Sequence, residues 1–478
     1  MRRSRKLLVL LGVLVAVCIV TVIVSMHEEK KEAIKNRDEV VLSLDPEKVT
    51  ALYWHNESGE FSFTKNEKWQ YDEDEAFPVD EEIVNEMLSL FEEFGAAFTI
   101  EDVEDFGQYG LDEPVCTIMM TSEEAGEIKV TLGDFSKMDS RRYVSVGDGN
   151  VYLVKTDPLD TFNAELSDMI LDDEIPEFTQ VTHAAFSGDV AYSFDYDEEG
   201  SSVQSEDVYF VKDGSEALPL DTSLVSDYLD GIRYLLLTDY ETYNASEADL
   251  KAFGLEDPDL SISLDYTFEN ENSEEESGSL TLHISRDPEE KAKAEAEEAN
   301  TEADEEDTED AGDDSAAITA YARIGDSKIV YTLSGSDYEA LMAASYNDLR
   351  HQKMYYGSYD DVTDVEILLE ETTYEMTSKK NKDERTYYYK DEEIDFSLIR
   401  SQLSTIEAYE FTEDAPAGKE EIRLKLKLDL EDYPETEIVF YRHDGDTCLA
   451  MVDGKSLAYV RRSDVMSLVE AIKGIVLN

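Results

Sequence analysis

The chain repeats one structural plan three times, and this self-similarity restricts its fold more than any other feature. Val-Thr pairs at 49–50, 181–182 and 362–363 each begin an apolar run of strand character. A second strand, a polar turn and an aromatic strand follow, the last at 69–71, 208–210 and 387–389. Such repetition is the signature of a repeat architecture. We therefore expect an α+β fold of three related β-rich repeats with antiparallel strands, at 49–177, 181–352 and 362–478.

An aspartate precedes a helical pattern in each repeat, at Asp80, Asp221 and Asp395. Aspartate is a strong N-cap because its carboxylate accepts the unpaired amide protons of the first turn and lies at the positive end of the helix dipole. After Asp80, apolar residues recur at helical spacing: Ile83, Val84, Met87, Leu88, Phe91 and Phe94. Such a stripe is typical of a helix that faces a hydrophobic core. Each repeat should therefore carry one capped helix.

The first two repeats share a Gly-Leu-acid-acid-Pro sequence, at 110–114 and 254–258, directly before a strand. Glycine permits a positive φ and proline fixes φ at the start of a strand, so the motif predicts a structural turn. Ligand binding by the paired acids is the alternative, although turns favour Asp in any case. Each repeat then closes with a hairpin and a final strand, in which Tyr152, Tyr331 and Tyr459 should be equivalent.

The N-terminal region is apolar enough to cross a membrane. Residues 7–26 have only two polar side chains, Thr21 and Ser25. At about 1.5 Å per residue, this run covers a hydrocarbon core of roughly 30 Å. A cleaved signal would be shorter and would end in small residues. The sequence predicts a cytoplasmic tail at 1–6, an uncleaved transmembrane anchor at 7–26 and a juxtamembrane linker at 27–48.

The orientation of this anchor is less constrained by the sequence, because basic residues are equally frequent on its two sides. Long domains translocate largely regardless of their charge. We therefore expect a single-pass cell-membrane protein with the bulk of the chain on the extracytoplasmic side.

These features together resemble a bacterial family of membrane-anchored repeat proteins, the domain of unknown function 4340. The resemblance rests on the anchor, the Val-Thr openings, the turn at 110–114 and the closing strand Gly-Asp-Gly-Asn-Val-Tyr-Leu-Val at 147–154. It covers most of the chain after the anchor and is clearest in the first repeat. Members are often associated with ABC-type transport systems similar to gliding-motility transporters, and no catalytic residues are established for them. The resemblance thus implies an ABC transporter accessory with a permease as partner.

The composition excludes several classes of partner. With 113 acidic and 41 basic side chains, the formal net charge is −72. Such a surface repels nucleic-acid phosphates and anionic lipid. Residues 286–315 alone hold fifteen acids and three bases. We expect this part of repeat 2 to be a disordered, solvated insertion between two strands, with loose attraction of a polycation or divalent ions as the alternative.

The sequence contains no recognisable catalytic or metal-binding motif. Six histidines are scattered singly, and there is no His-Glu-x-x-His, Cys-x-x-Cys, Gly-x-Ser-x-Gly, phosphate-binding loop or dinucleotide fingerprint. We therefore expect no enzyme activity, no catalytic residue and no cofactor. Cys116 and Cys448 lie in expected strands of the first and third repeats. We expect free buried thiols, with a bridge between them as the alternative.

One loop of repeat 2 matches a calcium-binding pattern in part. Asp195, Asp197, Glu199, Gly200 and Glu206 occupy positions 1, 3, 5, 6 and 12 of an EF-hand loop. The flanks at 190–194 and 208–211 alternate or run apolar like strands, whereas an EF-hand needs helices there. The equivalent turns of the other repeats lack these acids. The sequence predicts a hairpin turn with carboxylates in solvent, and calcium binding is the alternative.

Three functional hypotheses follow. The first is a non-enzymatic extracytoplasmic accessory to an ABC-type transport system. The second is a cell-surface protein that binds a wall polymer, a peptide or a cation, which a concave cluster of tyrosines would favour. The third is a hydrolase with a carboxylate pair that the sequence leaves unidentified, because 113 acids produce such pairs by chance.

Overall fold

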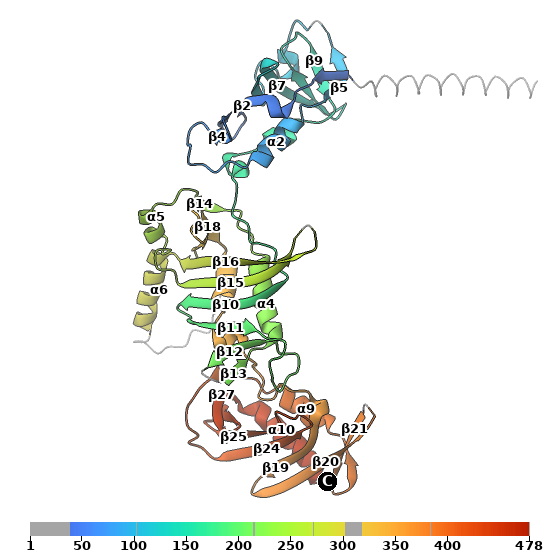
Figure 1. Ribbon diagram of the computed structural model, residues 1–478, viewed down its shortest axis with the longest axis vertical. Coiled ribbons are helices and arrows are strands. Elements are labelled where there is room, and N and C mark those ends of the chain that lie inside the picture. Colours follow the sequence, from blue (N-terminus) through green and yellow to red (C-terminus); the bar gives the residue numbers. More distant parts are fainter. Residues whose placement is uncertain are drawn as a thin grey trace, which may run out of the picture. The chain divides into compact units, whose positions relative to one another are not determined.

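In a computed structural model, the protein is described over residues 39–101, 103–213, 216–270, 272–301, 318–382 and 384–477. The chain divides into two compact units between Asp172 and Asp173. The first unit contains one nine-stranded sheet and the second contains two (Figure 1). Among the described helices, none has the length and apolar character needed to cross a membrane. The expected anchor at 7–26 and tail at 1–6 lie outside the described residues.

The sheet of repeat 1 is antiparallel throughout, with the order β1-β5-β9-β8-β7-β6-β2-β3-β4. Its strands are β1 (Glu39–Leu42), β2 (Val49–His55), β3 (Glu60–Lys65), β4 (Trp69–Tyr71), β5 (Phe94–Ile100), β6 (Cys116–Ser122), β7 (Gly126–Ser136), β8 (Arg141–Ser145) and β9 (Val151–Val154). Its helical segments are η1 (Pro46–Lys48), α2 (Glu81–Ser89), η2 (Gly107–Tyr109), α3 (Leu159–Phe162) and η3 (Leu166–Met169).

The sheet of repeat 2 has the order β13-β12-β11-β10-β15-β16-β17-β18-β14. Its strands are β10 (Gln180–Gly188), β11 (Tyr192–Tyr196), β12 (Tyr209–Asp213), β13 (Glu216–Pro219), β14 (Tyr240–Thr242), β15 (Leu260–Glu269), β16 (Glu275–Arg286), β17 (Ala320–Ile324) and β18 (Val330–Leu333). Its helices are α4 (Thr222–Arg233), α5 (Glu247–Ala252), α6 (Pro288–Thr301), α7 (Gly335–Met342) and α8 (Tyr346–Leu349).

The sheet of repeat 3 has the order β22-β21-β20-β19-β24-β25-β26-β27-β23. Its strands are β19 (Val362–Leu369), β20 (Thr372–Asn381), β21 (Glu384–Tyr389), β22 (Glu392–Ile394), β23 (Glu410–Phe411), β24 (Glu420–Leu428), β25 (Glu435–Arg442), β26 (Thr447–Val452) and β27 (Lys455–Arg461). Its helical segments are η5 (Tyr359–Asp361), α9 (Ser397–Ser404) and α10 (Arg462–Val476).

The three sheets share one topology, which confirms the repetition seen in the sequence. The Val-Thr strands β2, β10 and β19 each pair with the following strand on one side and with β6, β15 or β24 on the other. Tyr152, Tyr331 and Tyr459 lie in the equivalent strands β9, β18 and β27, as expected. One difference concerns the edges: sheet 1 gains β1 at one edge and lacks a counterpart of β13 and β22 at the other.

The expected helix is present in all three repeats, and the predicted aspartate is its N-cap in the first two but not in the third. The Asp80 carboxylate accepts the backbone N–H groups of Glu82 and Ile83, and Asp221 does the same for Ser223 and Leu224. Asp395 accepts only from Ser397, since α9 begins one residue later and Phe396 takes the cap position. Along α2, the predicted stripe is buried at Val84, Met87 and Leu88, but the helix ends at Ser89. Phe91 and Phe94 are buried as well, although Phe91 follows the helix and Phe94 begins β5, so the helical spacing predicted for them is wrong. The apolar periodicity therefore located the core side of this helix correctly.

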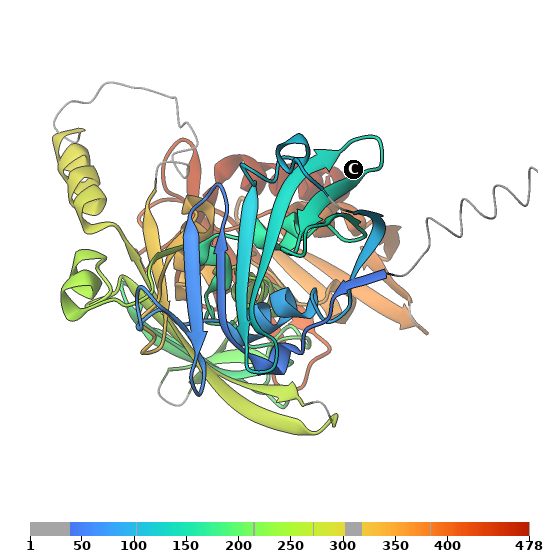
Figure 2. The same ribbon diagram turned by 90° about the horizontal axis from the view of Figure 1, so that it is seen from above.

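Two segments are more structured than the sequence indicated. The described part of the expected linker 27–48 contains η1 and β1, and β1 pairs with β5. Repeat 3 has a similar pairing, because Lys353 bridges Glu407 ahead of β23. In the insertion 286–315, the expectation of disorder is wrong for 288–301, which form α6 beside sheet 2 (Figure 2). Alanine, glutamate and lysine favour a helix even without a buried face. Residues 302–317 lie outside the described residues.

Candidate functional site

The loop that resembles a calcium site connects β11 to β12, so strands flank it as the sequence predicted. Asp195 lies in β11, where its carboxylate contacts His183 Nδ1 at 2.8 Å and Lys212 Nζ at 2.8 Å. Asp197 accepts the backbone N–H of Glu199 at 3.0 Å. Glu199 and Glu206 are exposed. Across the described residues, no three His, Cys, Asp or Glu side chains converge as a metal site would require.

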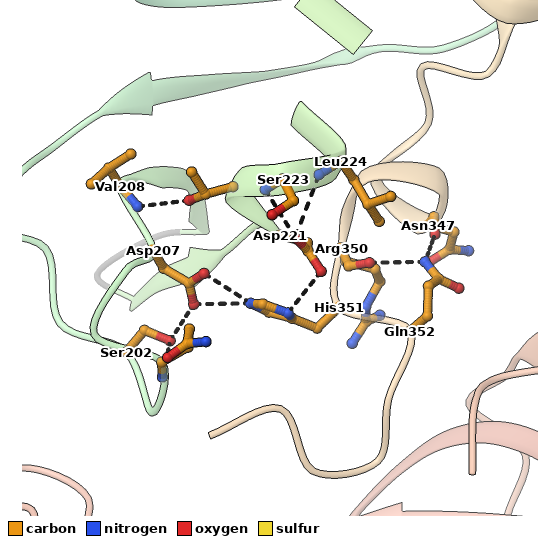
Figure 3. Close-up of polar contacts among 12 residues, drawn as sticks. Ser202, Asp207, Val208, Asp221, Ser223, Leu224, Asn347, Arg350, His351 and Gln352 are labelled. Atoms are coloured by element: carbon orange, nitrogen blue, oxygen red, sulfur yellow. Dashed lines mark hydrogen bonds and ion pairs between the residues drawn. The ribbon is translucent and has the colours of Figure 1, made fainter. Parts of the chain in front are cut away.

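Asp207 directly follows the loop and is buried, with 4% of its surface exposed. Its two carboxylate oxygens lie 3.0 and 2.9 Å from His351 Nε2. Ser202 Oγ donates to the same carboxylate at 2.6 Å (Figure 3). Burying a carboxylate is costly unless it is paired and hydrogen-bonded, and both conditions are met here.

The second nitrogen of His351 faces another carboxylate. His351 Nδ1 lies 3.2 Å from Asp221 Oδ2, while Asp221 Oδ1 caps α4. Figure 3 shows the imidazole between the two acids. Only the protonated ring can donate to both at once, because a neutral imidazole carries one N–H. The His351 ring also stacks on Tyr356, whose pKa is raised to about 12 by burial and then by the negative charge of Asp207.

The same loop contacts repeat 3. Val203 packs against the hydrophobic core of repeat 3, and the oxygen of Ser201 accepts from Tyr433 Oη at 2.7 Å. Gly357 leaves room for this packing, since a Cβ at that position would lie 2.4 Å from Val203 Cγ1. We call this set of contacts the repeat clasp; its residues are Ser201, Ser202, Val203, Asp207, Asp221, His351, Tyr356, Gly357 and Tyr433. The clasp joins repeats 2 and 3 within one compact unit.

The clasp does not have the geometry of a nucleophilic site. In a Ser-His-Asp arrangement the histidine takes the serine proton. Here Ser202 donates to Asp207 instead, and each ring nitrogen of His351 contacts a carboxylate. What the arrangement supplies is a hydrogen-bonded network of one imidazole and two carboxylates, in which removal of His351 would leave the buried Asp207 carboxylate without its main partner. Its chemistry is therefore that of a structural joint.

Sequence reasoning identified Asp221 only as a helix cap and missed the rest of the clasp. Asp207 and His351 lie 144 positions apart, so no local spacing connects them. The sequence offers only two weak signals for this contact: His351 is a lone histidine, and Asp207 directly precedes an aromatic strand.

The Gly-Leu-acid-acid-Pro segments are structural turns, as the sequence predicted. Gly110 and Gly254 have φ values of 70° and 76°, which other residues rarely adopt. Leu111 and Leu255 are buried, whereas the acids that follow each leucine are exposed. A Cβ at Gly110 would lie 2.6 Å from Asp134 Cγ, so the glycine also permits close packing.

Cys116 and Cys448 are free and buried, in agreement with the expected thiols. Cys116 lies in β6 and Cys448 in β26. Burial raises the pKa of Cys116 to about 12 and that of Cys448 to about 11. Neither thiol is therefore a reactive nucleophile near neutral pH.

Comparison with known families gives a match over most of repeat 1 and the start of repeat 2. Residues 69–201 match the family model described as "Domain of unknown function (DUF4340)". The chain carries a DUF4340 region. This region extends from β4 through repeat 1 and ends at Ser201 in the clasp loop, so the resemblance noted in the sequence is confirmed there. Neither a curated protein nor a solved structure matches the chain.

Proposed function

We propose that the protein is a single-pass membrane protein whose three β-rich repeats form a non-enzymatic, extracytoplasmic scaffold accessory to an ABC-type transport system. Two features support this proposal: the start of the first sheet close to the apolar N-terminal run, and the clasp that makes repeats 2 and 3 one body. The DUF4340 region is consistent with it, because the family resemblance implies such systems.

The position of β1 is the main observation in support of this proposal. β1 begins at Glu39 and is held by pairing with β5. Twelve residues, 27–38, separate it from the apolar run at 7–26. An extended chain spans at most about 3.6 Å per residue, so the sheet would begin within about 43 Å of the membrane. At that distance repeat 1 could contact the outer face of a permease.

The clasp supports a scaffold role for the remaining repeats. Two repeats linked only by a flexible segment would present independent surfaces, whereas a buried joint fixes them as one surface. Val203 and Ser201 make the contacts between repeats 2 and 3, and the contact of Asp207 with His351 holds the loop that carries them. A fixed surface lowers the entropy lost when a partner is bound.

Affinity purification from solubilised membranes tests the proposal. The full-length chain should recover a permease subunit, and protease added to wall-stripped cells should degrade the region after residue 26. Replacing residues 7–26 by an unrelated apolar span distinguishes a partner bound through the helix from one bound through the repeats. Complete protection in intact cells, or recovery of no transporter component, would contradict the proposal.

A second function, binding of a wall polymer or peptide, is favoured by one hollow in repeat 2. It has a volume of about 600 Å³ and is lined in part by Phe178, Tyr266 and Phe268. Phe178 and Tyr266 are buried in its wall with ring centroids 5.7 Å apart, so the half-buried Phe268 is the aromatic side chain that a ligand would contact. Calorimetry with soluble wall fragments on the wild type and on Phe268→Ala tests this alternative.

A further inference from the structure

The outer edge of β4 distinguishes repeat 1 from the other two repeats. In repeat 2, β13 covers the equivalent strand β12, and in repeat 3, β22 covers β21. β4 is the last strand of its sheet, and no described residue pairs with its second side. After Tyr71 the chain leaves the sheet in a loop that leads to α2 (Figure 1). Repeat 1 therefore presents an edge that its two relatives cover with their own chain.

The register shows which backbone groups this edge offers. Asp72 N donates to Ser62 O at 2.9 Å, and Asn66 N donates to Lys68 O at 3.1 Å. Bonded and non-bonded pairs alternate along an antiparallel ladder, so Gln70 faces β3 while the backbone N–H and C=O groups of Trp69 and Tyr71 point outward. An added strand could bond to both residues. This is the pairing used when peptides extend a sheet.

The tryptophan of the same strand has an indole N–H without a hydrogen-bond acceptor in the part of the chain that the structure describes. Trp69 is 3% exposed, yet its indole Nε1 donates to no acceptor among the described residues. The other tryptophan, Trp54, donates its Nε1 to the oxygen of Ala164 at 3.4 Å. A buried indole N–H usually finds an acceptor. The unmet donor of Trp69 therefore distinguishes this edge strand from β2, which holds Trp54.

The charge of the region indicates which kind of strand fits. Asp72, Glu73, Asp74 and Glu75 follow β4 directly. Antiparallel pairing of β4 with a second copy of itself would set these four acids against residues 65–68, of which only Lys65 and Lys68 are basic and Glu67 is acidic. A strand with lysine or arginine at every facing position would match the acidic run more completely. The edge is therefore suited to a different, basic chain.

We propose that β4 of repeat 1 accepts a β-strand from a basic segment of a partner protein, in the position that β13 and β22 fill in the other repeats. The partner strand forms backbone hydrogen bonds to Trp69 and Tyr71, and its basic side chains face the acids at 72–75. This inference does not depend on the anchor or on the transport role.

A pair of synthetic peptides tests the proposal on the full-length protein. The first is an octapeptide of alternating lysine and valine, and the second has the same sequence with N-methyl groups on alternate residues along one edge. Both carry the same charge, so general attraction to an acidic protein affects them equally. We expect the unmethylated peptide to bind at least tenfold more tightly and to slow amide hydrogen exchange at 69–71. Equal binding of the two peptides, or slowed exchange only at β13, β14, β22 or β23, would overturn the proposal.

Charge variants provide the matched control. Glu73→Gln with Glu75→Gln should weaken binding of the unmethylated peptide at least threefold at low salt. Glu392→Gln with Glu393→Gln removes two exposed acids from β22 and should leave the affinity unchanged. The opposite pattern would place the peptide at the wrong edge. Salt-resistant dimers cross-linked through position 70 would show that a second copy occupies β4, which also contradicts the proposal.

Discussion

The imidazole ring of His351 lies flat against the phenol ring of Tyr356, with centroids 3.8 Å apart and an angle of 5° between the planes. This stacking fixes the plane of the imidazole. Nε2 can then meet Asp207 while Nδ1 meets Asp221. The orientation of one ring thus determines both carboxylate contacts of His351, which hold the loop whose residues Ser201 and Val203 contact repeat 3.

Replacing His351 by phenylalanine should strongly destabilise the second unit. The His351→Phe variant keeps a ring to stack on Tyr356 but leaves Asp207, with 2% of its side chain exposed, without the imidazole that it contacts. We expect a loss of about 3 kcal/mol in the free energy of unfolding, measured by urea denaturation. The double variant with Asp207→Asn should recover part of this loss. Strictly additive effects would show that the two side chains are not coupled.

The three aspartates that precede the helices should differ in how much they stabilise the protein. Asp80→Ala removes only a cap and should cost about 1 kcal/mol. Asp221→Ala also removes a carboxylate from His351, so its cost should be larger, about 2 kcal/mol or more. Asp395 accepts a single backbone N–H, so Asp395→Ala should cost no more than Asp80→Ala. Thermal denaturation of the three variants measures this order, and a smaller effect at Asp221 than at Asp80 would contradict it.

The ion pairs of Asp195 should make stability sensitive to acid. The hydrogen bond from Lys212, followed by that from His183, lowers the pKa of Asp195 below its usual value. The stabilisation is therefore fully present above the unfolded pKa of about 3.9 and is lost as pH falls through the lower folded pKa. Asp195→Asn should lower stability at pH 7, and its effect should shrink as the pH falls through the folded pKa of Asp195. The difference should stay below about 1 kcal/mol, because water screens a partly exposed carboxylate.

The loop at 195–206 should show no tight calcium site. The Asp195 oxygens already contact His183 and Lys212, and strands rather than helices flank the loop. Calorimetry on the full-length protein should detect no saturable binding at micromolar Ca²⁺. The matched variant Glu206→Gln should behave like the wild type. A micromolar site that this substitution abolishes would refute the expectation.

Cys116 and Cys448 should resist alkylation in the folded protein. With pKa values raised by burial to about 12 and about 11, both remain protonated thiols at pH 8. The thiolate is the reactive form, so iodoacetamide should modify these residues only after denaturant is added. Mass spectrometry of the two tryptic peptides gives the result. Rapid modification of either residue without denaturant would indicate local opening of its sheet.

Local patterns predicted the repeated elements because each depends on neighbouring residues. The cap at Asp80, the apolar stripe of α2 and the turns at Gly110 and Gly254 all have short-range physical causes. The clasp could not be found in this way, since its contact between Asp207 and His351 arises only when distant segments pack together. β1 was missed because a four-residue strand among charged residues has no clear periodicity.

The pairing of β1 with β5 has a consequence for the solubility of shortened chains. β5 reads Phe-Gly-Ala-Ala-Phe-Thr-Ile, with no charge and no proline. Uncharged segments of this kind promote intermolecular aggregation when they lie at an uncovered edge. A chain cut at Val49, where the repeat pattern begins, would uncover the part of β5 that Glu39, Val40 and Leu42 now occupy. A chain that begins at Glu39 keeps this cover and should remain soluble at concentrations where the shorter chain precipitates.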